Sequence, residues 1–388
     1  MKKLAVALFV ALLGFVFTAP AFALENQFGG YWRVRMYHQS DFNGMDNGAA
    51  DAQLADTRTR LYYTAVLNDN LKFVNKFEMD AVWGNGSYGE LGSDGISVEV
   101  KHSYIDFNLG PYNFKVGTQG NVIQRGFVFD DDFSGIAGTV GDFGFMYAKI
   151  KENGQDVSAD DQLYNLNYTV NINRVKIVPN VTYMNLAADE YLYYAGLDVD
   201  GQMGGYNYWV SLIYNGGELA NDVDVKAFLI ALGGDVTVSD MLGVHFQTFY
   251  ATGDDDPADK DMEAYQTGNG HSYYWAEIMG LGTFDNQASA NSPGDQISNI
   301  WAVNLGVTYQ VNEKLSFGGD LWYATLVEEN AADEKYLGTE LDLTASYEVI
   351  EGLNLDLVAA YLFKGDATYG GSDDANPYEL GSQFSISF

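Results

Sequence analysis

The sequence contains no cysteine and only six prolines, and it is poor in basic residues. Without cysteine the chain cannot form a disulfide framework, a thiolate metal site or a C-x-x-C-H haem attachment. Its 20 lysines and arginines stand against 53 aspartates and glutamates, which gives a net charge of −33. Affinity for nucleic acid depends on neutralising phosphates with lysine and arginine, so no nucleic-acid partner is expected.

Long apolar runs are missing beyond the N-terminus. No later segment has the roughly 18 consecutive apolar residues that indicate a membrane-spanning helix. At the N-terminus Lys2 and Lys3 precede an apolar run, Leu4 to Thr18, and Ala21-Phe22-Ala23 supplies small residues at the −3 and −1 positions. This arrangement predicts a secretory signal peptide over residues 1–23. The alternative, a membrane anchor, needs about 20 apolar residues, and this run is shorter.

Sequence motifs of common enzymes are absent as well. The chain has no G-x-S-x-G, H-E-x-x-H, P-loop or dinucleotide-binding glycine motif, and its four histidines are scattered at His38, His102, His245 and His271. A catalytic triad is recognised by geometry rather than spacing, so a hydrolase stays a remote alternative. We expect neither enzymatic activity nor a cofactor.

Apolar residues are instead dispersed at every second position. The chain has 28 tyrosines, 23 phenylalanines and 43 glycines. From Trp301 to Val311 the odd positions are apolar, and the even positions are mostly small or polar. The same alternation recurs over residues 315–323, 341–349, 353–363 and 380–388. A period of two predicts β-strands with one apolar and one polar face.

These apolar faces need a cover, and the sequence has no amphipathic helix to provide one. Lipid can provide it, on condition that every backbone polar group is paired within the protein, which requires a closed sheet. Alternating segments of about ten residues, with aromatic residues at their ends, are typical of membrane barrels. We therefore predict an all-β fold, a transmembrane antiparallel β-barrel whose apolar faces contact lipid.

The links between the alternating segments are of two kinds. Short links are predicted near residues 68–70, 110–111, 141–142, 171–174, 201–205, 239–240, 312–314 and 351–352. Longer, acidic or glycine-rich links are predicted at 40–56, 84–95, 119–134, 151–161, 186–190, 216–224, 253–296, 328–334 and 366–376. This pattern predicts about 18 strands, with short periplasmic turns and long extracellular loops. A count of 16 is the alternative, because the pairs around Gly141 and Gly201 are weak.

The end of the chain and one internal hairpin carry a family resemblance. The final segment ELGSQFSISF alternates and ends in Phe388, which resembles the assembly signal of Gram-negative outer-membrane proteins. The stretch VKHSYIDFNLGPYNFKVGTQ (Val100–Gln119), followed by GFVFDDDFSGI, resembles the alginate-export and related 18-stranded porin-like families. Gly117-Thr118-Gln119 lacks the basic residue of that pattern. The mature chain, residues 24–388, thus resembles a porin of the cell outer membrane.

Basic residues gather on one wall of this barrel. If aromatic and aliphatic side chains face lipid, the polar parity places basic residues in the lumen, among them Arg33, Arg35, Arg58, Arg60, Lys76 and Lys115. A change of parity predicts a β-bulge near Lys101-His102. A charge facing lipid costs about 2–4 kcal/mol at mid-bilayer, which explains the inward direction but not the clustering. We interpret the cluster as the basic wall of a pore constriction.

The resemblance also implies an acidic counterpart to this wall. In many porins the third outer loop folds into the lumen, so the link at about 119–134 is expected to fold inward. It would set Asp130, Asp131 and Asp132 opposite the four arginines. Rings of opposed charge in a narrow pore set its ion preference. The alternative interpretation is an ordinary solvated acidic loop.

The longest link, about 253–296, contains two contrasting parts. Asp254, Asp256 and Asp259 are weak candidates for a Ca²⁺ site, since calcium prefers oxygen ligands, but a solvated loop tip is favoured over a metal site. The segment SYYWAEIMGLGTF, residues 272–284, is too apolar for a free loop. We expect it to fold against the lumen or neighbouring loops.

The functional prediction is a passive diffusion channel for small hydrophilic solutes and ions. The acidic loops favour a weak cation preference, which the arginines oppose. The alternative is a non-conducting structural or adhesive barrel, or a sheath around a partner protein. Expected partners are outer-membrane lipid and lipopolysaccharide, the latter bridged to acidic loops by divalent cations. The sequence leaves open whether the protein is a monomer or a homotrimer.

Overall fold

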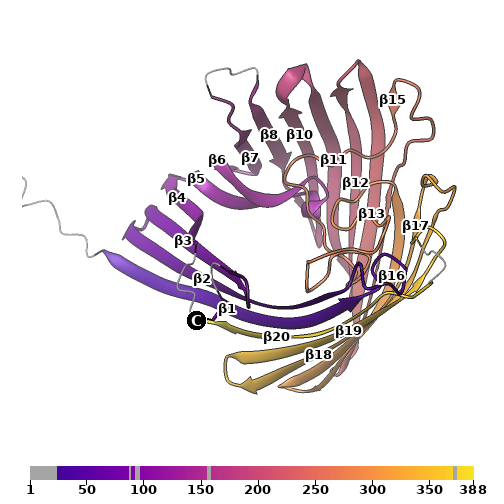
Figure 1. Ribbon diagram of the computed structural model, residues 1–388. Helices are drawn as coiled ribbons and strands as arrows, with labels where there is room; N and C mark the ends of the chain where they lie inside the picture. Colours follow the sequence, from indigo (N-terminus) through magenta and orange to yellow (C-terminus); the bar gives the residue numbers. More distant parts are fainter. Residues whose placement is uncertain (1–23, 87–88, 92–96, 155–158, 370–373) are drawn as a thin grey trace, which may run out of the picture.

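The computed structural model describes residues 24–86, 89–91, 97–154, 159–369 and 374–388 (Figure 1). The predicted signal peptide, residues 1–23, lies outside the described residues. Within the described part of the chain, no helix has both the length and the apolar character needed to cross a membrane.

The protein is an 18-stranded closed antiparallel barrel. Its strands are β1 (Glu25–Ser40), β2 (Ala52–Asn68), β3 (Leu71–Val82), β4 (Glu99–Leu109), β5 (Tyr112–Ile123), β6 (Phe129–Val140), β7 (Phe143–Lys151), β8 (Asp161–Tyr168), β9 (Val170–Ile172), β10 (Val175–Asn185), β11 (Tyr191–Met203), β12 (Tyr206–Leu219), β13 (Val223–Ser239), β14 (Leu242–Ala251), β15 (Asp261–Met262), β16 (Ile300–Asn312), β17 (Leu315–Leu326), β18 (Tyr336–Ile350), β19 (Leu353–Lys364) and β20 (Tyr378–Ser387). Strands β8 and β9 both pair with β10 and act as one barrel strand. The two-residue β15 lies in the link between β14 and β16, which pair directly with each other.

Closure of the barrel depends on the two ends of the chain. Strand β20 pairs antiparallel with β1, and Tyr31 lies opposite Ser387. Gly30 and Phe388 extend this pairing with two backbone hydrogen bonds of 2.8 and 3.1 Å. A Cβ atom at Gly30 would lie 2.5 Å from Cζ of Phe388, so the terminal ring packs directly over this glycine. The closed ladder leaves no open sheet edge in the membrane.

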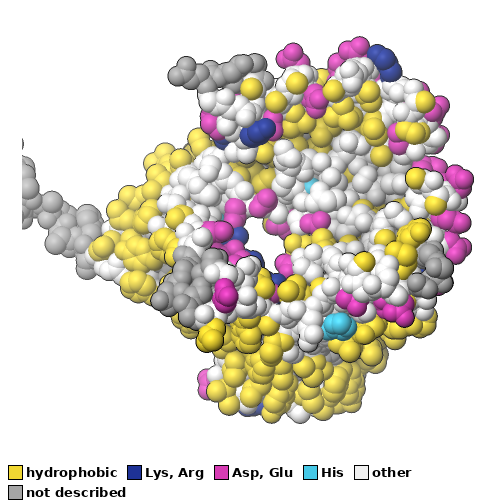
Figure 2. All heavy atoms as spheres, viewed as in Figure 1, with side chains coloured by type: hydrophobic (Ala, Val, Ile, Leu, Met, Phe, Trp, Pro, Cys, Tyr) yellow, Lys and Arg dark blue, Asp and Glu magenta, His cyan; other side chains and the backbone are white. Residues whose placement is uncertain are grey.

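The alternation of apolar and polar residues in the sequence corresponds to side chains that face outward and inward by turns. On β16 the side chain of Leu305 is 58% exposed, whereas that of Asn304 is 2% exposed. On β20 Leu380 is 52% exposed and Glu379 is fully buried. Apolar side chains cover the outer surface in broad patches (Figure 2). The predicted all-β fold with an outward apolar face is confirmed.

The two ends of the barrel differ in their connections. All eight predicted short links are tight turns, and the glycines at positions 110, 141 and 352 adopt positive φ values of 62°, 64° and 83° in them. Glycine has no Cβ and adopts this conformation at little cost. The pairs around Gly141 and Gly201 both form, so the count of 18 is confirmed over 16.

The predicted outer loop at 119–134 is wrong in its extent. Strand β5 continues to Ile123 and β6 begins at Phe129, so that Gly120 pairs with Asp132 and Asn121 with Asp131. Only a tight connection remains, with a 3₁₀ turn over Gln124–Gly126. Aspartate is depleted in most strands, so local propensity favours a loop at Asp130–Asp132. In the barrel these residues extend the hairpin, because pairing with β5 satisfies their backbone hydrogen bonds.

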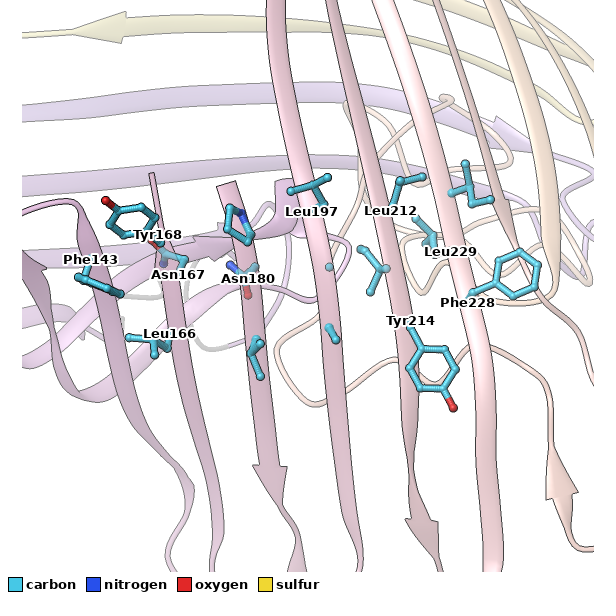
Figure 3. A pocket seen from close by; sticks show the side chains of 16 residues that line it. Phe143, Leu166, Asn167, Tyr168, Asn180, Leu197, Leu212, Tyr214, Phe228 and Leu229 are labelled. Carbon is cyan, nitrogen blue, oxygen red and sulfur yellow. The ribbon is translucent and has the colours of Figure 1, made fainter. Parts of the chain in front are cut away.

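Two irregularities interrupt the ladder of hydrogen bonds. The register shifts opposite Lys76 and Phe77, which pair with His102 and Val100, so the predicted bulge near Lys101 is confirmed. The gap between β8 and β9 lies near Pro179 of β10. Proline cannot donate to a ladder, which accounts for the weakened pairing there. Pro179 also lines an outward-facing apolar hollow of about 750 Å³ over β7 to β13 (Figure 3).

Candidate functional site in the barrel lumen

The long link between β14 and β16, residues 252–299, folds into the lumen (Figure 1). Large apolar side chains along it are buried, namely Tyr265, Trp275, Ile278, Met279, Phe284 and Ile297. The expectation that residues 272–284 pack inward is confirmed. We call residues 252–299 the inner loop.

Hydrogen bonds and ring contacts fix the inner loop to the wall. The Glu340 carboxylate on β18, which is fully buried, accepts the backbone N–H groups of Ile278 at 2.6 Å and Met279 at 2.9 Å. The ring of Phe284 stacks on Tyr37 of β1 with 4.7 Å between centroids. The inner loop therefore contacts both β18 and β1, which are far apart in the chain and lie close together because the barrel closes.

The β5–β6 hairpin meets the inner loop inside the barrel. At its tip Phe127 is fully buried and stacks on Tyr273 with 4.1 Å between centroids. The Phe127 carbonyl accepts hydrogen bonds from the Tyr265 hydroxyl and from Nδ1 of His271, both at 2.9 Å. Nε2 of His271 accepts the N–H of Ile297 at 3.1 Å, which assigns the proton to Nδ1. Burial lowers the pKa of His271 to about 4, so the neutral ring holds this junction.

The hairpin tip also reaches the wall beyond the inner loop. Arg125, with a left-handed φ of 59°, forms an ion pair with Asp200 on β11 and lies 4.8 Å above the ring of Trp209 on β12. Hairpin and inner loop together fill one part of the lumen. Figure 2 shows an opening beside this mass, with basic and acidic side chains along it.

The predicted arginines lie together along strands β1 and β2. Arg33 is directly opposite Arg58, and Tyr31 is opposite Arg60. Arg33 and Arg58 line two hollows, of about 250 and 480 Å³. Arg35 contributes to the first hollow and Arg60 to the second. This is an open, charged stretch of wall that the inner loop does not fill.

Carboxylates neutralise most of this wall. Arg35 binds Asp56 at 2.9 Å and Asp285 at 2.5 Å. Arg58 binds Asp80 at 2.6 Å, and Arg60 forms an ion pair with Glu78. Asp56, Asp80 and Glu78 each lie on the neighbouring strand, directly opposite the arginine that they bind, so the pairing follows from the cross-strand register.

Three of the six basic residues predicted for the pore wall have no ion pair among the described residues. One is Arg33, whose Nε is buried without a hydrogen-bond partner. Lys76 lies 4.9 Å from the ring centre of Tyr62, and Lys115 lies 5.8 Å from that of Tyr104. Arg33, Lys76 and Lys115 form what we call the free cation track.

Asp130, Asp131 and Asp132 occupy a different place from the predicted one. Asp132 binds Lys101 at 2.6 Å and His102 at 2.8 Å on β4. In the part of the chain that the structure describes, none of the three aspartates forms an ion pair with Arg33, Arg35, Arg58 or Arg60. The acid that an inward-folded loop brings to the arginines is Asp285. It directly follows the apolar segment 272–284, and this adjacency is the one signal in the sequence that could have identified it.

The candidate metal ligands are not brought together. Asp256 and Asp259 are exposed, and each accepts a backbone N–H two residues further on, from Ala258 and Asp261. Over the described ranges, no group of three or more acidic, histidine or cysteine residues is arranged to hold a metal ion. Asp256 and Asp259 thus lie on an exposed stretch of the inner loop, whereas Asp254 is half-buried.

The barrel is similar to solved outer-membrane channels. The outer membrane protein OpdK from Pseudomonas aeruginosa matches with a TM-score of 0.62 at 12% identity, over 94% of this chain and 98% of OpdK. OccAB4 from Acinetobacter baumannii matches with 0.60 at 13% identity, over 94% and 98%. A BenF-like porin from Pseudomonas fluorescens Pf-5 matches with 0.60 at 13% identity, over 95% and 100%. No protein-family model and no curated protein matches the sequence.

At these identities the similarity establishes the fold. The closed barrel, its outward apolar face and these matches define the class of the chain: a β-barrel with the fold of 18-stranded outer-membrane porins. Its similarity to OpdK, OccAB4 and the BenF-like porin extends over nearly the whole length of each.

Proposed function

We propose that the protein is a passive diffusion channel of the outer membrane for small hydrophilic solutes. The observation that supports this best is the incomplete filling of the lumen. The inner loop and the β5–β6 hairpin pack against one part of the wall, and charged hollows of about 250 and 480 Å³ stay open along β1 and β2. Barrels of this strand number usually enclose an aqueous channel.

We further propose that the free cation track attracts solutes carrying a carboxylate. Arg35, Arg58 and Arg60 are already paired with acids, so Arg33, Lys76 and Lys115 are the predicted wall residues left to attract a passing anion. The attraction of anions by this part of the wall opposes the cation preference that is expected from the net charge. One similar solved structure is described as OpdK of Pseudomonas aeruginosa with vanillate, a small aromatic carboxylate.

Single-channel recording in planar bilayers tests the channel itself. The refolded protein is expected to give ohmic conductance steps. Silence from correctly folded protein would instead support the non-conducting alternative, a structural or adhesive barrel or a sheath around a partner. Homotrimer formation and bridging of lipopolysaccharide by divalent cations stay predictions.

Reversal potentials in a salt gradient test the free cation track. A unit charge 4–8 Å from a passing ion in a water-like medium contributes about 0.5–1 kcal/mol. Loss of the charge disfavours chloride and favours potassium by this amount each, so Arg33→Ala is expected to lower the chloride-to-potassium permeability ratio by about five- to thirtyfold. Lys314→Ala, which removes an equal charge from the β16–β17 turn, is the matched control. An unchanged ratio in Arg33→Ala would show that this residue does not face the permeation path.

A further inference from the structure

A second hollow in the lumen lies apart from the arginines. It has a volume of about 410 Å³ and lies beneath the inner loop, against strands β14, β16, β17 and β18. Its lining includes His245, Asp320, Asp342, Glu277, Trp275 and Trp322, and it shares no residue with the two hollows along β1 and β2. None of its lining residues is lysine or arginine.

An unpartnered carboxylate oxygen lies in the wall of this hollow. The side chain of Asp342 belongs to a residue that is only 5% exposed, and its Oδ1 has no hydrogen-bond partner. Its Oδ2 receives one long contact of 3.4 Å, from the N–H of Glu277. The carboxyl of Glu340, which accepts two backbone N–H groups of the inner loop, also lies within hydrogen-bond reach of Asp342. Neighbouring buried carboxyls without a basic partner are costly, so this pair favours a cationic donor from outside the chain.

A second carboxylate faces the same hollow from β17. Asp320 contacts Nε2 of His245 at 2.7 Å and Nδ2 of Asn304 at 3.0 Å. Both contacts use Oδ1, and no hydrogen bond to Oδ2 is found among the described residues. Asp320 is therefore held in place by two wall residues and keeps one oxygen for another donor.

Aromatic rings complete the lining. Trp275 of the inner loop and Trp322 of β17 meet edge to face, with 5.1 Å between centroids. Indole faces attract organic cations, and their apolar surface accommodates the alkyl part of such a cation. Two carboxylates with free oxygens, two indoles and no lysine or arginine suit a ligand that is both cationic and organic.

We propose that this hollow, the amine site, binds the protonated amino group of a small organic solute. The ammonium group donates hydrogen bonds to Oδ1 of Asp342 and Oδ2 of Asp320, and its alkyl part lies against Trp275 and Trp322. The proposal concerns binding and does not require that the protein conducts. It holds or fails independently of the proposed channel function.

Isothermal titration calorimetry of the full-length refolded protein with propylammonium chloride at pH 7.5 tests the site. Saturable binding is expected, and Asp342→Asn is expected to raise the dissociation constant at least about tenfold, because the loss of one charge-assisted hydrogen bond corresponds to such a factor. Asp320→Asn, at the more exposed rim, is expected to raise it about threefold or more. Asp256→Asn, on the exposed stretch of the inner loop, is the matched control and should leave binding unchanged.

Several outcomes would overturn the proposal. These are the absence of saturable binding, an affinity in both Asp342→Asn and Asp320→Asn that equals that of the unchanged protein, or equally tight binding of propionate. Displacement of propylammonium by equimolar Mg²⁺ would show a general cation site and also refute recognition of an organic amine. Far-ultraviolet circular dichroism confirms folding of each variant, and Asp320→Asn alone decides the matter if Asp342→Asn does not fold.

Discussion

The attachment of the inner loop to Glu340 predicts how much of the lumen the loop occupies. Glu340→Ala removes the acceptor of two buried N–H groups, at Ile278 and Met279. Each unsatisfied buried donor costs about 1–3 kcal/mol, so the seated loop loses about 2–6 kcal/mol. The ratio of seated to displaced loop is then expected to fall by about thirtyfold to about twenty-thousandfold.

Single-channel recording measures this change directly. If the displaced inner loop vacates part of the lumen, Glu340→Ala should show larger conductance steps or frequent excursions to a larger state. Hydrogen exchange at residues 275–284 should accelerate by a similar factor. Glu351→Ala, in the exposed β18–β19 turn, removes a carboxylate without touching the loop and should behave as the unchanged protein. Unaltered conductance and exchange in Glu340→Ala would refute the role of this carboxylate as the loop anchor.

Two further predictions concern the junction inside the lumen and the seam of the barrel. For His271, the pKa is about 4 in the folded protein and about 6.5 unfolded, so the unfolded state binds more protons between these values. The stability that the neutral ring contributes is present above about pH 6.5 and is lost as pH falls toward 4, by about 3 kcal/mol in total. Denaturant unfolding at pH 7 and at pH 4.5 should show this loss of stability. His271→Gln should abolish the difference between the two pH values. At the β1–β20 closure, Gly30→Ala would bring a Cβ to 2.5 Å from Cζ of Phe388 and should destabilise the barrel by about 1–3 kcal/mol in thermal unfolding. Gly205→Ala places a Cβ in open space and should leave the stability unchanged. Equal melting temperatures of the two variants would contradict the packing of Phe388 over Gly30.

The fold followed from the sequence because its cause is local. Each strand of a membrane barrel must present an apolar face to lipid, so every second residue is apolar, as in Trp301–Val311. Turn glycines such as Gly110 and Gly352 mark the short links for an equally local reason. The inward direction of Arg33 and Arg58 follows from the same parity.

The contents of the lumen did not follow in the same way. Residues 119–134 form a paired hairpin rather than a loop, because the partner strand supplies hydrogen bonds that local propensity cannot anticipate. Asp285 binds Arg35, which lies 250 positions away in the chain, and Asp132 forms an ion pair with Lys101 rather than with an arginine of β1 or β2.

The periodicity of the sequence alone thus predicts the strands of the barrel wall, their topology and the face of the wall on which each charged side chain lies. The path of the inner loop, and with it the partner of each charge, depends on contacts between segments that are distant in the chain. Such contacts have no period and leave no local pattern, so only the closed, packed barrel reveals which cations stay free and which carboxylates lack a donor.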